Sequence, residues 1–109
     1  MLKLVKNKKV IIIVTSIIIA VFLFALFLQK NRWYSQTEVA SHANQRSCWT
    51  SINGSVYDVT PLANTHSGGS ETILQVCGTD GSTIFTTRHG NENDPKLELE
   101  KYKIGILHY

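Results

Sequence analysis

Two histidines, His66 and His89, are the side chains of this 109-residue chain that best suit metal chemistry. Two glycines, Gly68 and Gly69, follow His66 after one intervening residue. A histidine beside two glycines joins a strong metal ligand to backbone that carries no side-chain bulk. This combination suits a flat cofactor that lies against the chain while the imidazole reaches its metal. The same pattern also occurs in ordinary surface turns, so its meaning depends on the elements around it.

Other uses of these residues have less support in the sequence. His89 is also compatible with a residue that closes a helix, where its charge suits the helix dipole. That role is the simplest one for His42, which we do not count as a ligand. A zinc site would combine His66 and His89 with Cys48 and Cys77, but these residues include no close pair of the kind that structural zinc sites use. The sequence contains no Ser-His-Asp or phosphate-loop pattern.

The segment that precedes the histidines has the pattern of a short helix. Ser35 and Glu38 have the spacing of a capping box, in which each residue satisfies a free backbone N–H of the other. Tyr34 and Val39 occupy the positions of a hydrophobic staple on either side of the cap. These residues predict a helix that runs to about residue 42.

A β-hairpin should follow this helix. Two short runs, residues 48–52 and 55–59, flank Asn53 and Gly54, the pair that most strongly predicts a tight hairpin turn. Pro61 then opens a short helical turn, which delivers the first histidine.

Two further helical segments lead to the second histidine. Ser70 is placed to cap the first segment and Asp80 the second, which ends near His89. Residues 90–95 form a polar loop, and residues 102–106 alternate between apolar and polar as a closing strand would. The apolar side chains in between either line a cofactor pocket or form plain core. They are Ile73, Leu74, Val76, Ile84, Phe85 and Leu97.

The first third of the chain contains a candidate membrane segment. Residues 10–28 form 19 consecutive positions without a charge. As a helix they would span roughly 28 Å, about the hydrocarbon thickness of a bilayer. A cleaved signal peptide usually has a shorter apolar region and a small-x-small cleavage site, which is missing at the end of this run. We therefore expect an uncleaved signal anchor.

The distribution of charge predicts the orientation of this anchor. Four lysines precede the segment and two basic residues follow it, which places residues 1–9 in the cytoplasm and the rest outside. Residues 29–33 would be a linker, and the aromatic pair Trp33 and Tyr34 suits the bilayer interface. From residue 30 onward there are seven Lys or Arg and eight Asp or Glu, so the net charge of +3 comes from the N-terminal tail. The basic balance is therefore no argument for nucleic acid. The six flanking basic residues are Lys3, Lys6, Lys8, Lys9, Lys30 and Arg32.

The remaining domain, residues 34–109, is small for a self-sufficient core, so a covalent link or a buried cofactor would help it fold. In an oxidising compartment Cys48 and Cys77 can pair. Such a link would stabilise the fold by about 3–4 kcal/mol in the chain-entropy model. Two buried free thiols are the alternative if the orientation is reversed.

Together these segments predict an α+β domain in which a small sheet carries two helical hairpins, each presenting one histidine to one face of a planar metal macrocycle. The segments closely resemble cytochrome b5, over Tyr34 to about Leu107. The resemblance is carried by Ser35, Glu38, Val39, Ala40 and His42 in the opening helix, by Cys48, Trp49, Thr50, Ile52, Asn53, Gly54, Val56, Tyr57, Asp58, Val59 and Thr60 in the hairpin, by His66, Gly68 and Gly69, and by Lys101, Tyr102, Ile104 and Gly105 at the end.

The resemblance implies b-type haem held non-covalently, with His66 and His89 as the two axial ligands of its iron. The second ring nitrogen of each ligand should donate to a backbone carbonyl. Further cofactor-binding positions are expected around the histidines. They are Leu62, Gly68, Gly69, Ile73, Leu74 and Phe85.

Three positions depart from the pattern of the best-known members of that family. Ser67 stands where proline is usual, and Leu62 stands where an aromatic residue is common. At the second histidine, His89 follows Phe85 by four residues and is followed by Gly90, whereas the best-known members have a slightly longer link and a serine after the histidine. The short link and the pair of cysteines look like the exported bacterial variety of the family. All three departures leave both histidines in place.

Two axial histidines fill both open positions of a haem iron, which favours electron transfer over bond-making catalysis. The sequence therefore predicts a membrane-anchored one-electron carrier rather than an enzyme, serving an unidentified redox partner. The alternative is a non-redox module that relays or stores haem, or that binds a small ligand. The membrane-associated relatives of the progesterone receptor are of this last kind, but they lack the paired histidines.

Overall fold

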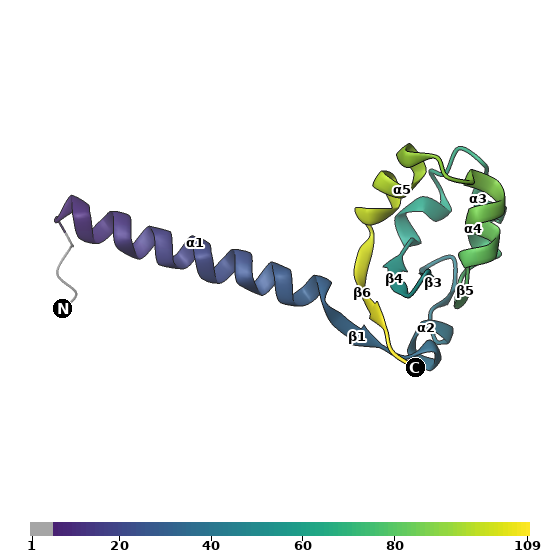
Figure 1. The fold of residues 1–109 in the computed structure, drawn as a ribbon, viewed down its shortest axis with the longest axis horizontal. Helices are drawn as coiled ribbons and strands as arrows, with labels where there is room; N and C mark the ends of the chain where they lie inside the picture. The colour runs from purple at the N-terminus through teal and green to yellow at the C-terminus, as the bar shows by residue number, and fades with distance from the viewer. Residues whose placement is uncertain (1–5) are drawn as a thin grey trace.

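The computed structural model describes residues 6–109, in which a long N-terminal helix leads into one α+β domain (Figure 1). The predicted α+β class is confirmed. Lys3, which belongs to the predicted cytoplasmic tail, lies outside the described residues.

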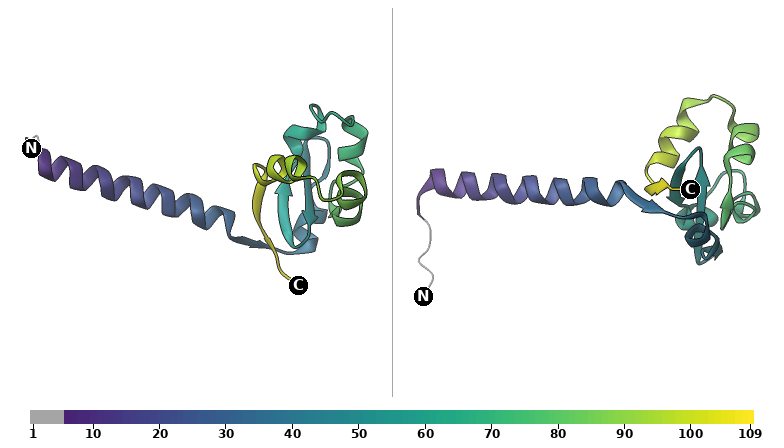
Figure 2. Two further views of the ribbon diagram at one scale, coloured as in Figure 1. Left: turned by 45° about the horizontal axis from the view of Figure 1, so that its top comes forward. Right: turned by 60° about the horizontal axis from the view of Figure 1, so that its bottom comes forward.

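Helix α1 (Lys8–Lys30) contains the whole predicted membrane segment. The side chain of Asn7 caps its first turn. The hydroxyls of Thr15 and Ser16 donate to carbonyls of the preceding turn, which satisfies them within the apolar run. In the described part of the chain, α1 is the one helix that is long and apolar enough to cross a membrane. It extends away from the domain with its apolar side chains exposed (Figure 2).

The domain is built on a six-stranded sheet with the order β1-β6-β4-β3-β2, in which β5 also pairs with β3. Strands β3 and β4 form the predicted hairpin, with Ile52 opposite Ser55. Its turn holds Asn53 at φ 49° and Gly54 at φ 80°, the two positive angles that a tight hairpin turn of this type requires. The strands are β1 (Arg32–Tyr34), β2 (Ala43–Asn44), β3 (Ser47–Ile52), β4 (Ser55–Asp58), β5 (Thr79–Asp80) and β6 (Lys103–Leu107).

Strand β1 was not predicted, and it changes the expected linker. It pairs in parallel with β6 from the far end of the chain, with Arg32 opposite Gly105. Residues 29 and 30 of the predicted linker belong to α1, and residues 32 and 33 belong to β1. Only Asn31 separates the last residue of α1 from the first residue of the sheet.

The two aromatic residues of β1 have different surroundings. Tyr34 is 9% exposed, and its ring meets the ring of Trp49 edge-on at 5.2 Å. The expectation that Tyr34 lies at a bilayer interface is therefore wrong, because this ring belongs to the core of the domain. Trp33 is 63% exposed and points out of that core.

The helices follow the predicted order with shifted ends. The capping box of α2 is present, because the Ser35 hydroxyl accepts from the Glu38 N–H and the Glu38 carboxylate accepts from the Ser35 N–H. Pro61 lies in the short 3₁₀ helix η1, as predicted. The helices are α2 (Gln36–Ala40), η1 (Thr60–Ala63), α3 (Ser70–Leu74), α4 (Ser82–His89) and α5 (Asn93–Glu100).

Four boundaries differ from the prediction. Ser70 is the first residue of α3, and Gly69 is the capping residue without a side-chain hydrogen bond. Asp80 lies one residue before the cap of α4, where its carboxylate still accepts from the Ser82 N–H at 2.9 Å. Helix α5 begins at Asn93, inside the predicted polar loop. Helix α2 ends at residue 40 because the chain turns into β2 at residue 43.

Two buried clusters lie in the domain. The first contains the disulfide between Cys48 of β3 and Cys77, the latter in the turn after α3, and it includes Ile73 and Leu99. The second is formed by Tyr34, Val39, Val56 and Leu107. The predicted closing strand is shifted by one residue, so that Leu107, rather than Ile106, is the more buried side chain at its end.

Candidate functional site

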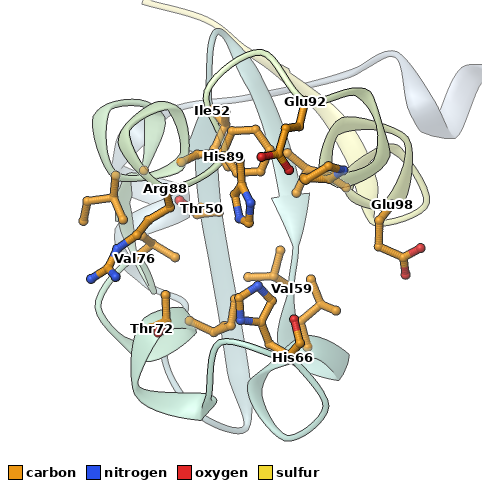
Figure 3. Close-up of a pocket in the computed structure, with 18 of the residues that line it drawn as sticks. Thr50, Ile52, Val59, His66, Thr72, Val76, Arg88, His89, Glu92 and Glu98 are labelled. Atoms are coloured by element: carbon orange, nitrogen blue, oxygen red, sulfur yellow. The ribbon is translucent and has the colours of Figure 1, made fainter.

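A cavity of about 420 Å³ opens between the segment that carries His66 and the helices α4 and α5 (Figure 3). Its size lies within the range of ordinary cofactor and ligand sites. The walls are mostly apolar, and both histidines line it. The apolar wall residues are Ile52, Val59, Leu62, Ile73, Val76, Ile84, Phe85 and Leu99.

Several predicted pocket residues are among these walls, and others are not. Leu62, Ile73 and Phe85 line the cavity. Leu74 and Leu97 do not line it and are 37% and 66% exposed, because both lie on the outer faces of their helices. The glycines of the first histidine motif also lie outside the wall, and their contribution is to the backbone that supports His66.

The first histidine is held by the turn that precedes it. The His66 N–H donates to the Leu62 carbonyl at 3.0 Å, which continues η1 by one turn. Gly69 then adopts φ 92°, a conformation that side-chain-bearing residues rarely adopt. A Cβ on Gly68 would lie 2.9 Å from Cε1 of the His66 ring. Gly69 is therefore needed for its backbone angle, and Gly68 is needed for the space that it leaves to the His66 imidazole.

The second histidine closes helix α4. His89 is its last residue, and Gly90 ends it at φ 55° with its N–H bonded to the Thr86 carbonyl. The ring of Phe85, one turn earlier, lies 4.9 Å from the His89 ring, centroid to centroid. This contact limits the imidazole to the side of the helix that faces the cavity.

The two imidazoles face each other across the cavity (Figure 3). Their centroids are 6.2 Å apart and their planes lie at 85°. A metal bound by both would need a centroid separation of about 6 Å, from two metal–nitrogen bonds of about 2 Å and about 1.1 Å from each ring centre to its nitrogen. The observed centroid separation of 6.2 Å matches this requirement.

The hydrogen bond of His66 differs from the predicted one. Its Nδ1 accepts from the Gly68 N–H at 3.2 Å, whereas the prediction was donation to a carbonyl. A neutral imidazole that accepts at Nδ1 carries its proton on Nε2. Metal binding through Nε2 therefore requires the proton on Nδ1 and the loss of this contact.

The floor of the cavity contains Thr50 and Gly81, which were not predicted as site residues. Thr50 of β3 is 1% exposed and donates to the Thr79 carbonyl at 2.9 Å. A Cβ on Gly81 would lie 2.8 Å from the Thr50 hydroxyl oxygen, so this position accepts only glycine without rearrangement. The alternation of side chains along a strand puts Thr50 and Ile52 on one face, which was the available signal.

The rim of the cavity carries charges of both signs. Arg88 lies on the α3 side, and three carboxylates lie on the α5 side. The hydrogen bond from Lys101 holds the pKa of the Glu98 carboxyl below its usual value. That carboxylate therefore stays ionised at neutral pH. The three acidic residues are Glu92, Asp94 and Glu98.

The zinc alternative is wrong, because Cys48 and Cys77 are bonded to each other. Among residues 6–109 no group of three or more His, Cys, Asp or Glu is placed to hold a metal ion. His42 stacks on Trp49 at 3.6 Å and shares a hydrogen bond with Ser47, away from the cavity. The two imidazoles of His66 and His89 therefore fit a planar group that supplies the equatorial ligands of its own metal and leaves two axial positions for protein ligands.

The domain is similar in sequence to known proteins. Residues 35–108 match the family model described as "Cytochrome b5-like Heme/Steroid binding domain". Cytochrome b5 of Drosophila melanogaster is 34% identical over 79 residues, 72% of this chain and 58% of that protein. The NADH nitrate reductase of Volvox carteri is 42% identical over 76 residues, which cover 70% of this chain and 9% of that protein. The chain therefore spans less than two-thirds of the length of these relatives.

A solved structure is also similar. Cytochrome b558 of Ectothiorhodospira vacuolata, described as a prokaryotic homologue of cytochrome b5, superimposes with a TM-score of 0.65 at 30% identity. The match covers 71% of this chain and 99% of that one. It extends the likeness from the sequence motifs to the arrangement of the sheet and helices.

Proposed function

This chain belongs to the cytochrome b5-like haem-binding family, and from that membership we propose that it is a membrane-anchored one-electron carrier with His66 and His89 as axial haem ligands. Domains of this family bind b-type haem non-covalently and carry electrons. The observation that supports the ligand pair is the 6.2 Å separation of two imidazoles that face each other across an apolar cavity.

The proposed ligand pair limits the chemistry of the site. Bound haem supplies a ferric/ferrous couple, and two protein ligands leave no open position for a substrate on the iron. Apolar walls surround both imidazoles, while η1 and α4 position the rings. We therefore propose that the chain acts as a carrier and not as an enzyme in its own right. The redox partner would exchange electrons at the rim of the cavity.

The anchor is supported by the apolar helix α1 and by the lysines on its N-terminal side. We propose a cytoplasmic N-terminal tail of residues 1–9, a single membrane span within α1, and a haem domain outside the cytoplasm. The disulfide between Cys48 and Cys77 favours that side of the membrane, since such bonds persist in oxidising compartments.

One absorbance experiment tests the haem proposal. The whole 109-residue chain, purified in detergent and reconstituted with haem, should bind it one-to-one and give a low-spin, bis-imidazole spectrum when oxidised and when reduced. A colourless chain that cannot be reconstituted would contradict the proposal. A reversible redox couple would separate electron transfer from a non-redox binding module, and slow haem dissociation would argue against a haem relay.

The orientation is tested separately in native membranes. Under non-reducing conditions, a membrane-impermeant thiol reagent should leave both cysteines unmodified, and after reduction and partial unfolding it should label them from the outer side only. Labelling only from the cytoplasmic side would show that the orientation is opposite to the one proposed. The proposal for the haem site would not be affected by that result.

A further inference from the structure

The charges around the cavity are segregated, and one cation stands alone. Among the cavity-lining residues of the described chain, Arg88 is the only lysine or arginine. It directly precedes His89 at the end of α4 and lies on the same side of the cavity as Val76 and Thr72 (Figure 3). Its guanidinium lies at the outer edge of that side and points away from the two imidazoles (Figure 3).

The opposite side of the rim is negative. Glu92 and Glu98 lie across the cavity from Arg88 (Figure 3), and Asp94 lines the same region. Glu98 is bound by Lys101, outside the cavity lining, and keeps its charge at neutral pH. An anionic group entering the cavity would be repelled from this side and attracted to Arg88.

The Arg88 side chain has no competing partner in the part of the chain that the structure describes. It takes part in no hydrogen bond or ion pair there, and it is exposed. The next position after the second histidine is Gly90, which offers no side-chain donor. Five N–H donors at the rim are thus available to a ligand.

We propose that Arg88 binds a propionate of haem b and so determines which edge of the macrocycle faces the α3 side of the cavity. Haem b carries two propionates, and guanidinium pairs with carboxylates through two parallel hydrogen bonds. The acidic residues on the α5 side disfavour the opposite placement. This inference rests on the proposed haem-binding function and adds a residue that sets affinity and orientation.

The test compares haem with haem dimethyl ester, in which both propionates are neutral. The whole chain and its Arg88→Gln variant are reconstituted with each, and dissociation is followed by transfer to an excess of apomyoglobin. We expect Arg88→Gln to release haem about tenfold faster, a typical effect for loss of a charge-assisted hydrogen bond. It should release the dimethyl ester at the wild-type rate. Raising the salt concentration should reduce the difference for haem.

Two controls make the outcome specific to Arg88. Arg46→Gln removes an exposed arginine from the turn before β3, away from the cavity, and should leave both rates unchanged. Arg88→Lys, which keeps the charge but loses the planar fork, should give an intermediate rate. If Arg88→Gln changed neither rate, or changed both equally, the inference would be wrong while low-spin haem binding still supported the proposed function. A wild-type chain that bound no haem would overturn both.

Discussion

His66 and His89 differ from the other histidines of the domain in what their rings contact. Both border the cavity and face each other, whereas His42 stacks on Trp49 and shares a hydrogen bond with Ser47. The His42 ring packs on an indole away from the cavity, whereas the His66 and His89 rings both line the cavity. This difference in surroundings separates the ligand candidates from His42.

Replacing either proposed ligand should remove one axial bond. We expect His89→Ala to bind haem more weakly and to give a high-spin spectrum, and the same is expected for His66→Ala. His42→Ala is the matched control and should keep the low-spin spectrum. Absorbance and electron paramagnetic resonance of the reconstituted chains measure this, and a low-spin His89→Ala protein would show that another residue is the second ligand.

Gly68 should be required because of space and not because of its backbone angle. In Gly68→Ala the new Cβ would meet Cε1 of His66 at 2.9 Å, so the ring must move. We expect haem affinity to fall about five- to thirtyfold, the effect of a displaced packing contact of about 1–2 kcal/mol. The neighbouring Ser70→Ala, at an exposed helix start, should bind as the wild type does. Equal affinities of the two variants in a haem titration would contradict this account of the turn.

At the scale of elements, the disulfide joins β3 to the turn after α3 and thereby holds one wall of the cavity. Cys48 and Cys77 are separated by 29 residues and lie in the same buried cluster as Ile73. Their link therefore restrains the helix that follows the first histidine. The sheet and the cavity wall are tied together in this way before any cofactor binds.

Breaking this link should destabilise the domain. The chain-entropy model gives a loss of about 3–4 kcal/mol in the free energy of unfolding for a closed loop of about 30 residues. Urea unfolding followed by tryptophan fluorescence measures this in the oxidised chain and after reduction. The Cys48→Ala/Cys77→Ala double variant gives a second estimate of the free energy of unfolding without the disulfide. Its stability should not change when reductant is added. Unchanged stability after reduction would mean that packing alone holds the two segments.

The contact between β4 and α5 should depend on pH. Burial raises the pKa of Tyr57 from 10.0 to about 12, and its hydroxyl donates to Glu100 at 3.0 Å. Between these two pH values the unfolded chain loses the phenol proton while the folded domain retains it. The stabilising effect of the neutral phenol is therefore fully present below pH 10 and is lost as the pH rises toward 12.

Tyr57→Phe should remove this part of the alkaline sensitivity. Urea unfolding at about pH 9 and about pH 11 should show a smaller fall in stability for the variant than for the wild type. Tyr109→Phe, at a fully exposed position, is the control and should keep the wild-type slope. If both variants kept that slope, Tyr57 would not account for the pH dependence.

At the scale of the whole molecule, the sheet joins the first and last strands of the domain. Strand β1, which follows α1 after one residue, pairs with β6, and α1 also lies beside β6. With a single residue between helix and sheet, a membrane-embedded α1 would keep the haem domain close to the bilayer surface. Trp33 is then the exposed aromatic residue nearest to that surface.

The position of the domain boundary can be tested by truncation. A fragment of residues 32–109 should fold, whereas residues 35–109 lack β1 and the buried Tyr34 ring. We expect the shorter fragment to be less stable by about 3 kcal/mol or more, the usual cost of losing a buried aromatic side chain. Thermal unfolding of the two fragments by circular dichroism measures this. Equal stability would mean that neither β1 nor the Tyr34 ring contributes to the stability of the domain.

The sequence by itself determined the elements whose signals are local. The capping box at Ser35, the Asn53–Gly54 hairpin, the apolar segment and the glycines after the first histidine depend on neighbouring residues, so periodicity and turn chemistry were sufficient to identify them. The resemblance carried by those segments also indicated the fold and the haem.

Only the tertiary structure decided which distant residues meet. The pairing of β1 with β6, the Thr50 and Gly81 floor and the exposure of Leu74 depend on contacts between segments far apart in the chain. Local pattern does not encode such contacts, because a short strand or a small helix has too few residues to specify its partner. The 6.2 Å gap between the imidazoles is likewise a property of packed helices, and it is this distance that turns two histidines into one candidate site.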